Sequence, residues 1–278
     1  MGKMHKLPFK SRTGNRATRP LQFIHSDVGG MVNPSRQGFR YWITFLDEHN
    51  RFLWVLFMKH KSEAQDTYNR WKADVQAYFQ EEVGDISLSP NFVQFLRTDN
   101  GGEYTSKAFE AQLRKEGVLH ETTAADTPEQ NGMAERVNQT LVNLTVAMLI
   151  ESGLPKSFWV DAMQTAAYVI CRSPAKGLKG KTPYQTLFGE QRKIDVSLFH
   201  PFGCPAYALI PKDQRQGKFA PKGRKCIFLG YEYGKQAYRL MDVTTRRVFS
   251  SRHVQFNENG GPPAEFLNEL GPEPVDNA

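Results

Sequence analysis

The amino-acid sequence predicts an α/β protein: a mixed five-stranded sheet flanked by helices, followed by a small β-barrel domain. Two patterns support this prediction. Apolar runs of strand length alternate with helical periodicity in the first part of the chain, and short strand-like runs separated by glycines follow in the last part. The expected organisation is a basic extended arm at 1–20, an α/β core at 21–173, a linker at 174–200, a basic barrel at 201–256 and an acidic disordered tail at 257–278.

Three strand-like runs open the core. They cover residues 21–28, 39–46 and 51–58, and a tight connection from Asp47 to Asn50 joins the second run to the third. Links this short favour an antiparallel meander. The aromatic residues of these runs fit packing within a sheet better than stacking on bases, because they sit among other apolar residues.

A helix, a strand, a second helix and a short strand come next. Ser62, with Gln65 three residues later, predicts a capped helix that ends before Gly84. The run at 92–99, which follows this helix in the sequence, is apolar on both faces, which indicates a buried central strand. The elements after the first helix are expected at 92–99, 106–116 and 118–122.

A long helix beginning near Pro128 carries an acidic residue close to its start. Glu135 lies about 200° round the helix from Met133, at ~100° per residue, so we expect it to project off the packed face. Gly132 leaves room for a bound strand to come close, which favours a site at the sheet edge over a plain solvent-exposed glutamate. The apolar stripe expected to pack is Met133, Val137, Leu141, Leu144 and Met148.

A further helix over 155–173 completes the core, and the pattern then changes. Residues 174–200 are rich in Lys, Gly and Pro, with one short turn near 183–188. The spacing of the later apolar runs suits a small barrel. Its four strands are expected at 206–210, 225–229, 237–241 and 248–255.

Length and composition narrow the protein class. The 278 residues suffice for one sizeable core and a second small domain, and an apolar content of 40% with 23% charged residues is ordinary for a globular protein. No apolar run approaches the ~20 residues of a membrane span, and the start lacks the apolar segment of a signal peptide. Three widely spaced cysteines show no zinc-ligand pairing. We therefore expect reduced thiols, an intracellular protein, no membrane partner and no zinc site.

The net charge of +7 is unevenly distributed. Residues 1–20 hold six Lys/Arg and no acids, residues 201–256 hold 11 bases against 3 acids, and residues 257–278 hold five acids and no bases. Phosphate backbones are suitable partners for the two basic segments. Ordinary solvated Lys and Arg remain the alternative, most of all for the first twenty residues.

Three carboxylates stand where they could share one site. Asp27 closes the first strand, Asp99 ends the central strand in a turn forced by paired glycines, and Glu135 follows after 35 intervening residues. Hard divalent cations prefer such oxygen ligands. Two metal ions roughly 3.5–4 Å apart can activate an attacking oxygen and stabilise a leaving one in phosphodiester chemistry. Taken singly, each acid reads better as a turn, strand-end or solvent-facing residue.

The motifs around these acids resemble the D,D-35-E triad of retroviral and retrotransposon integrases, and they point to the copia-type branch. The resemblance covers nearly the whole chain. It implies a ribonuclease-H-like core, in which the first and fourth strands lie side by side, followed by a small β-barrel. The strings that carry it are His25-Ser-Asp-Val28, Arg97-Thr-Asp-Asn-Gly-Gly-Glu-Tyr104, Gln130-Asn-Gly132 and Ala134-Glu-Arg136.

The resemblance implies a Mg-dependent integrase that trims the 3′ ends of element DNA and joins them to target DNA. Two Mg²⁺ or Mn²⁺ ions would be held by Asp27, Asp99 and Glu135, with Asn131 and Arg136 steadying the DNA end. Implied partners are DNA, further copies of the chain and other polyprotein segments, and the implied location is the nucleus after cytoplasmic synthesis. Candidate phosphate contacts in the barrel are Lys218, Lys222, Arg224, Lys225, Arg246 and Arg247.

Two departures from the family pattern keep alternatives open. The string Gly2-Lys3…Leu7-Pro8-Phe9 follows a His/Cys zinc-binding module in copia-type proteins, whereas here it begins the chain, which suggests a fragment or a degraded copy. Val137 and Gln139 stand where family members often carry bases. Both favour a decayed or co-opted protein that only binds nucleic acid, whereas the intact triad favours an enzyme. A ribonuclease of the same fold is the second alternative, and Gln130-Asn-Gly132 argues against it.

Overall fold

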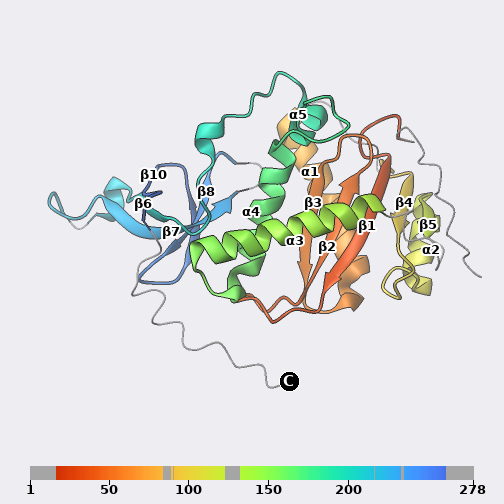
Figure 1. The fold of residues 1–278 in the computed structure, drawn as a ribbon, viewed down its shortest axis with the longest axis horizontal. Coiled ribbons are helices and arrows are strands. Elements are labelled where there is room, and N and C mark those ends of the chain that lie inside the picture. The colour runs from red at the N-terminus through yellow and green to blue at the C-terminus, as the bar shows by residue number, and fades with distance from the viewer. Residues whose placement is uncertain are drawn as a thin grey trace, which may run out of the picture.

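Two five-stranded sheets organise the protein (Figure 1). The computed structural model describes residues 17–83, 89, 91–122, 132–215, 217–232 and 235–260. The first sheet has the strand order β3-β2-β1-β4-β5 and mixes antiparallel with parallel neighbours, whereas the second, β10-β6-β7-β8-β9, is antiparallel throughout. The predicted α/β fold with a mixed sheet and a following small barrel is confirmed.

The first sheet alternates with helices along the chain. Its strands are β1 (Phe23–Gly30), β2 (Tyr41–Asp47), β3 (Leu53–Met58), β4 (Phe95–Thr98) and β5 (Leu119–Thr122). The helices are α1 (Ala64–Val83), α2 (Lys107–Glu116), α3 (Gly132–Ser152), α4 (Trp159–Arg172) and α5 (Pro183–Phe188). The second sheet consists of β6 (Pro205–Leu209), β7 (Gly223–Tyr231), β8 (Tyr238–Asp242), β9 (Val248–Ser251) and β10 (Val254–Phe256).

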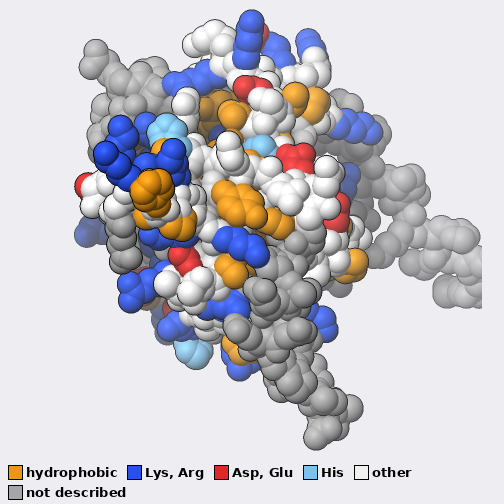
Figure 2. Space-filling model, turned by 90° about the vertical axis from the view of Figure 1, so that its left-hand side faces the viewer, with side chains coloured by type: hydrophobic (Ala, Val, Ile, Leu, Met, Phe, Trp, Pro, Cys, Tyr) orange, Lys and Arg blue, Asp and Glu red, His pale blue; other side chains and the backbone are white. Residues whose placement is uncertain are grey.

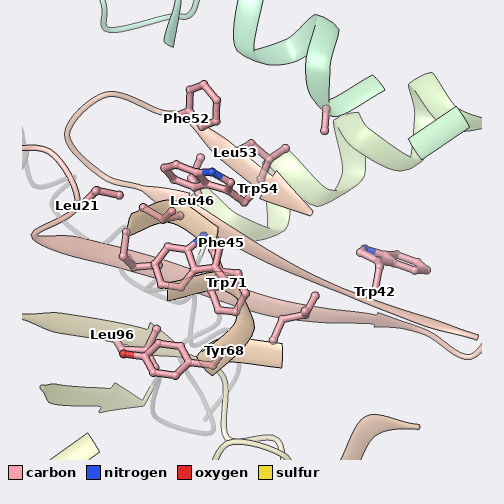
Figure 3. Packing of buried hydrophobic residues seen from close by; sticks show 14 of the residues in the cluster. Leu21, Trp42, Phe45, Leu46, Phe52, Leu53, Trp54, Tyr68, Trp71 and Leu96 are labelled. Atoms are coloured by element: carbon pink, nitrogen blue, oxygen red, sulfur yellow. The ribbon is translucent and has the colours of Figure 1, made fainter. Parts of the chain in front are cut away.

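Helices cover both faces of the first sheet (Figure 1). On one face, α1 buries aromatic rings against the sheet: Trp71 stacks on Phe45 with ring centroids 4.4 Å apart and meets the ring of Trp54 edge-on (Figure 3). Phe109 of α2 meets Tyr68 of α1 edge-on at 5.4 Å, which joins the two helices. On the other face, α3 packs against β1 and β2, and α4 packs against β3. Aromatic burial of this kind dominates the energy of a core.

Some element boundaries differ from the predicted ones. The first helix is preceded by a 3-10 turn whose Glu63 carboxylate accepts a hydrogen bond from the His60 amide, so Ser62 and Gln65 do not form the cap. The strand expected at 248–255 is divided into β9 and β10, and β10 pairs with β6. The segment predicted to be a linker contributes α5, whose Phe188 packs edge-on against Phe52 of the core.

Helix α4 lies between the two sheets and contacts both β3 and β7. Phe158 and Ala162 pack with Ile227, Leu229 and Met241 in a separate apolar cluster. At the bulge in β7, Gly230 adopts φ +122°, and a Cβ there would lie 2.4 Å from the Thr165 hydroxyl. Only glycine permits this approach of the barrel to the helix.

A buried carboxylate on α4 links the two domains. Asp161 is fully buried; it accepts hydrogen bonds from Arg36 Nε at 3.0 Å, from Gln37 Nε2 at 3.3 Å and from Arg239 Nη2 at 3.0 Å. Arg36 and Gln37 follow β1, whereas Arg239 belongs to the barrel strand β8. One carboxylate therefore holds the connection after β1 and the barrel together, because a buried charge needs its partners.

None of the helices in the described part of the chain has the length and apolar character needed to cross a membrane.

Candidate active site

The parallel pairing of β1 with β4 brings the two aspartates together. Residues Phe23 to His25 pair with Phe95 to Arg97, and the same register continued by two residues places Asp27 opposite Asp99. Neighbouring strands lie about 4.8 Å apart, so the two acids are close neighbours at this edge of the sheet. The turn after β4 orients the second acid, because the Gly101 amide donates a hydrogen bond to Asp99 Oδ1 at 3.0 Å.

Asp27 sits in an environment that disfavours its charge. Burial raises the pKa of Asp27 above its ordinary value, and the nearby carboxylates of Asp99 and Glu135 raise it further. Two hydrogen bonds oppose this effect: Asn138 Nδ2 donates to Asp27 Oδ2 at 2.6 Å, and the backbone amide of Val28 donates to the same carboxylate. Asp99 and Glu135 therefore both act on Asp27 electrostatically, which requires that they lie in the same region of the molecule as Asp27.

Helix α3 presents Glu135 to this region. Its most deeply buried positions are Ala134, Asn138, Leu141, Thr145 and Ser152, whereas the predicted stripe is only half-buried apart from Leu141. The predicted packing face was thus displaced around the helix, because the position that meets β1 is an asparagine. Glu135 lies one turn before Asn138 and about 60° round from it, at ~100° per residue. The Glu135 side chain is exposed at the border of the sheet-facing side.

The three acids do not form a ready-made metal cage. Within the ranges that the structure describes, no group of three His, Cys, Asp or Glu side chains lies close enough to hold a metal ion together. The donor set nevertheless suits a hard cation, since Asp27 is a desolvated carboxylate beside two other acids, and only the Asn138 amide and the Val28 backbone amide offset its charge. Glu135 lies three residues before Asn138 along α3, a rise of about 4.5 Å, and its exposed side chain is the third carboxylate of the set.

A hydrogen bond between two buried polar residues joins the segments that carry the two aspartates. Ser26 Oγ and Tyr104 OH share a hydrogen bond of 2.7 Å, and both side chains are fully buried. Burial also raises the pKa of Tyr104 well above its ordinary value, so its hydroxyl stays protonated. This pair ties the strand carrying Asp27 to the turn after Asp99, because Tyr104 follows that turn. It fixes the separation of the two aspartates.

Asn138 is a functional candidate that the sequence analysis missed. The residue lies on the helix that carries Glu135 and bonds Asp27 directly, while its own Oδ1 is buried and has no partner among the described residues. Asn138 is three residues from Glu135, so the two side chains occupy neighbouring positions on the helix surface. This spacing is the sequence feature that could have identified Asn138 as a site residue. Asn138 is a positioning residue, since it holds the carboxylate of Asp27 in one orientation.

If the three acids serve one reaction, replacing Asn138 with alanine should impair that reaction through Asp27. Loss of the amide raises the pKa of Asp27 further, so the acidic limb of the pH–rate profile should move to higher pH. The rate at neutral pH should fall about 10- to 100-fold, as found for partners of metal ligands. Asn138→Gln should recover part of the rate. An unchanged pH profile in the alanine variant would show that the hydrogen bond has no role in catalysis.

The predicted DNA-contacting residues are only partly brought together. Asn131 lies outside the described residues, and the Nε of Arg136 donates to Gly132 O at 2.7 Å beside Glu135. In the barrel, Val243 N donates to Lys225 O, which places the turn carrying Arg246 and Arg247 next to the start of β7. Arg224 pairs with Asp242 at 3.4 Å, so part of its charge is already neutralised. Lys218, Lys222, Lys225 and Arg247 are exposed.

Comparisons with known proteins find two matching families, one for each part of the chain. Residues 17–128 match the integrase core domain family, and residues 204–267 match the retroviral polymerase SH3-like domain family. The retrovirus-related Pol polyprotein from transposon TNT 1-94 of Nicotiana tabacum is 38% identical over 259 residues, which cover 93% of this chain. The corresponding polyprotein from transposon RE1 of Arabidopsis thaliana is 34% identical over 272 residues, or 98% of this chain. The chain spans 18% of the length of each polyprotein.

One solved structure shares the fold over nearly the whole chain. It is a chain of the simian T-cell lymphotropic virus intasome, solved in complex with PP2A regulatory subunit B56 gamma, with a TM-score of 0.51. The alignment covers 92% of this chain and 84% of that chain at 17% sequence identity, so it shows the fold alone.

Proposed function

Because the chain belongs to the integrases of copia-type retrotransposons, we propose that it is a metal-dependent polynucleotidyl transferase that trims and joins DNA ends. The observation that supports this most is the placement of Asp27 opposite Asp99, with Glu135 close enough to raise the pKa of Asp27. A buried carboxylate whose charge is disfavoured by two neighbouring acids costs stability, which is the expected arrangement at a functional site rather than in a structural cluster.

Asp27, Asp99 and Glu135 would hold two Mg²⁺ or Mn²⁺ ions. When bound, these ions would activate the attacking oxygen and stabilise the leaving oxygen at a phosphodiester. The chain's own residues orient the acids: Asn138 holds the carboxylate of Asp27, the Ser26–Tyr104 pair ties its strand to the turn after Asp99, and the Gly101 amide holds Asp99. Both trimming and joining are in-line displacements at phosphorus, so one site suffices for the two reactions.

The barrel would contribute to the grip on DNA. Exposed lysines and arginines near the start of β7 and on the β8–β9 turn offer phosphate contacts, and residues 201–256 carry 11 bases against 3 acids. Such contacts make affinity fall steeply with salt. We include as partners further copies of the chain and the remaining polyprotein segments. We place its action in the nucleus after cytoplasmic synthesis, which imaging of a tagged chain would test.

The test is nicking of supercoiled plasmid by the purified chain with Mg²⁺ or Mn²⁺, with EDTA as the control. The parent should nick and join DNA, whereas Asp99→Asn and Glu135→Gln should retain DNA binding without nicking. The exposed lysines and arginines of the barrel, which need no metal to bind phosphate, favour a second candidate, a protein that only binds nucleic acid. Binding by the parent without metal-dependent nicking would establish this second candidate.

A further inference from the structure

The far end of the barrel combines exposed apolar side chains with lysines. Figure 1 places the connection between β6 and β7 at the end of the molecule opposite to β4 and β5, and Figure 2 shows hydrophobic and basic side chains side by side on that end. Phe219 is fully exposed, and Tyr207 and Leu209 are 44% and 48% exposed. Exposed large apolar groups that gather on one surface mark a binding site. We call this surface the barrel shelf; it comprises Tyr207, Leu209, Lys218, Phe219, Lys222 and Lys225.

Strand pairing explains how the barrel shelf is built. Tyr207 of β6 lies between Gln255 of β10 and Lys225 of β7, so the three side chains point to the same outer face. Leu209, two residues further on, pairs with Gly223, and both residues line a hollow of about 470 Å³ together with Tyr207 and Lys222. A second hollow of about 390 Å³ adjoins it through Lys222 and is lined also by Lys218.

The charge on the barrel shelf is not neutralised within the described part of the chain. Neither Lys222 nor Lys225 pairs with a carboxylate there, and two of the three acids of residues 201–256 are engaged elsewhere. Asp242 binds Arg224, and Glu232 accepts a hydrogen bond from Ser250. The shelf therefore offers phosphate-binding ammonium groups directly beside apolar rings.

We propose that the barrel shelf binds an unpaired nucleic-acid strand, with bases stacked on Tyr207 and Phe219 and phosphates held by Lys218, Lys222 and Lys225. A duplex keeps its base faces inside its own stack and could use only the lysines. An unpaired strand offers both phosphates and apolar base faces, which matches the composition of the shelf. The assignment of these lysines as phosphate contacts rests on the proposed function, but the stacking site is remote from the three acids and separate from their chemistry.

Fluorescence anisotropy in EDTA tests this proposal with the full chain. The probes are a labelled 20-nucleotide oligo(dT), the equivalent oligo(rU) and a 20-base-pair hairpin duplex. Tyr207→Ser and Phe219→Ser should each weaken binding of an unpaired strand about 5- to 10-fold, because one base loses its stacking partner, and weaken duplex binding less than about 2-fold. Lys222→Gln should weaken both. Preference for oligo(dT) or for oligo(rU) would tell whether the strand is DNA or RNA.

The matched control is Ile150→Ser, which removes a 77% exposed apolar side chain that belongs to α3 and is not part of the shelf. It should leave all three affinities unchanged. Equal losses on the duplex and the unpaired strand, no loss in either shelf variant, or displacement of oligo(dT) by an acidic peptide at matched charge concentration would each overturn the proposal. The assay needs no metal, so a protein inactive in nicking can still pass it, and an active one can still fail it.

Discussion

Asp27→Asn is expected to abolish nicking and strand transfer while leaving the metal-free fold at least as stable as the parent. The loss of rate should exceed about 100-fold, because even partners of metal ligands cost 10- to 100-fold when removed. DNA binding should be retained, since the barrel is unaffected. The combination is diagnostic: a residue that served the fold would lose stability on replacement, whereas one held in place for catalysis would not.

The sign of the stability effect follows from the direction of the pKa shift. Burial and the two neighbouring acids raise the pKa of Asp27 in the folded protein. Its contribution to stability is therefore present below the unfolded-state pKa and is lost as the pH rises through the folded-state pKa. A neutral asparagine avoids this loss, so the gain in midpoint temperature, a few degrees for about 1 kcal/mol, should appear at pH 7 and vanish near pH 3.

Thermal unfolding in EDTA at about pH 7 and about pH 3 measures the shift in midpoint temperature. Nicking assays on the same preparations measure the loss of rate. Glu151→Gln is the matched control, because it neutralises an exposed acid at the other end of α3. It should change neither the midpoint temperature nor the nicking rate. An Asp27→Asn protein that still nicks DNA, or one that unfolds well below the parent, would contradict the proposed role.

The sequence predicted the fold class well because local pattern and global fold agree in the first sheet. Apolar runs of strand length, tight links and helical stripes all lie within a few residues of β1 to β5. The adjacency of Asp27 and Asp99 came only through the family resemblance, since no residue pattern within one chain specifies that β1 pairs with β4. The helix cap at His60 was missed because a 3-10 turn precedes α1 and shifts the start.

The sequence did not predict the buried polar contacts of α3 and α4, and the reason is the same for both helices. A search for apolar periodicity assigns the buried face of a helix to its apolar residues, whereas the most buried positions here include Asn138 and Asp161. Both are buried because a partner on another element meets them: Asp27 for one, Arg36 and Arg239 for the other. Such partners are distant in sequence, so only the tertiary structure reveals them.

Asp161→Ala is expected to have the largest effect on stability, a loss of about 3 kcal/mol in the free energy of unfolding. The change leaves Arg36 and Arg239 without the carboxylate that both of them bind, at a place where their side chains are only 25% and 21% exposed. Removing one member of a buried ion pair costs more than the pair contributes, because the remaining charges stay desolvated. Urea unfolding monitored by tryptophan fluorescence measures the loss.

The same variant should loosen the barrel from the core, because Asp161 is the point at which the connection after β1 and strand β8 meet. Unfolding of the barrel before the core, seen as a second transition, is the expected sign. The matched control is Glu110→Ala, which breaks an exposed pair with Arg114 on α2 and should cost less than about 0.5 kcal/mol. Equal losses in the two variants would contradict the role of Asp161, since a surface pair and a shared buried carboxylate would then be energetically alike.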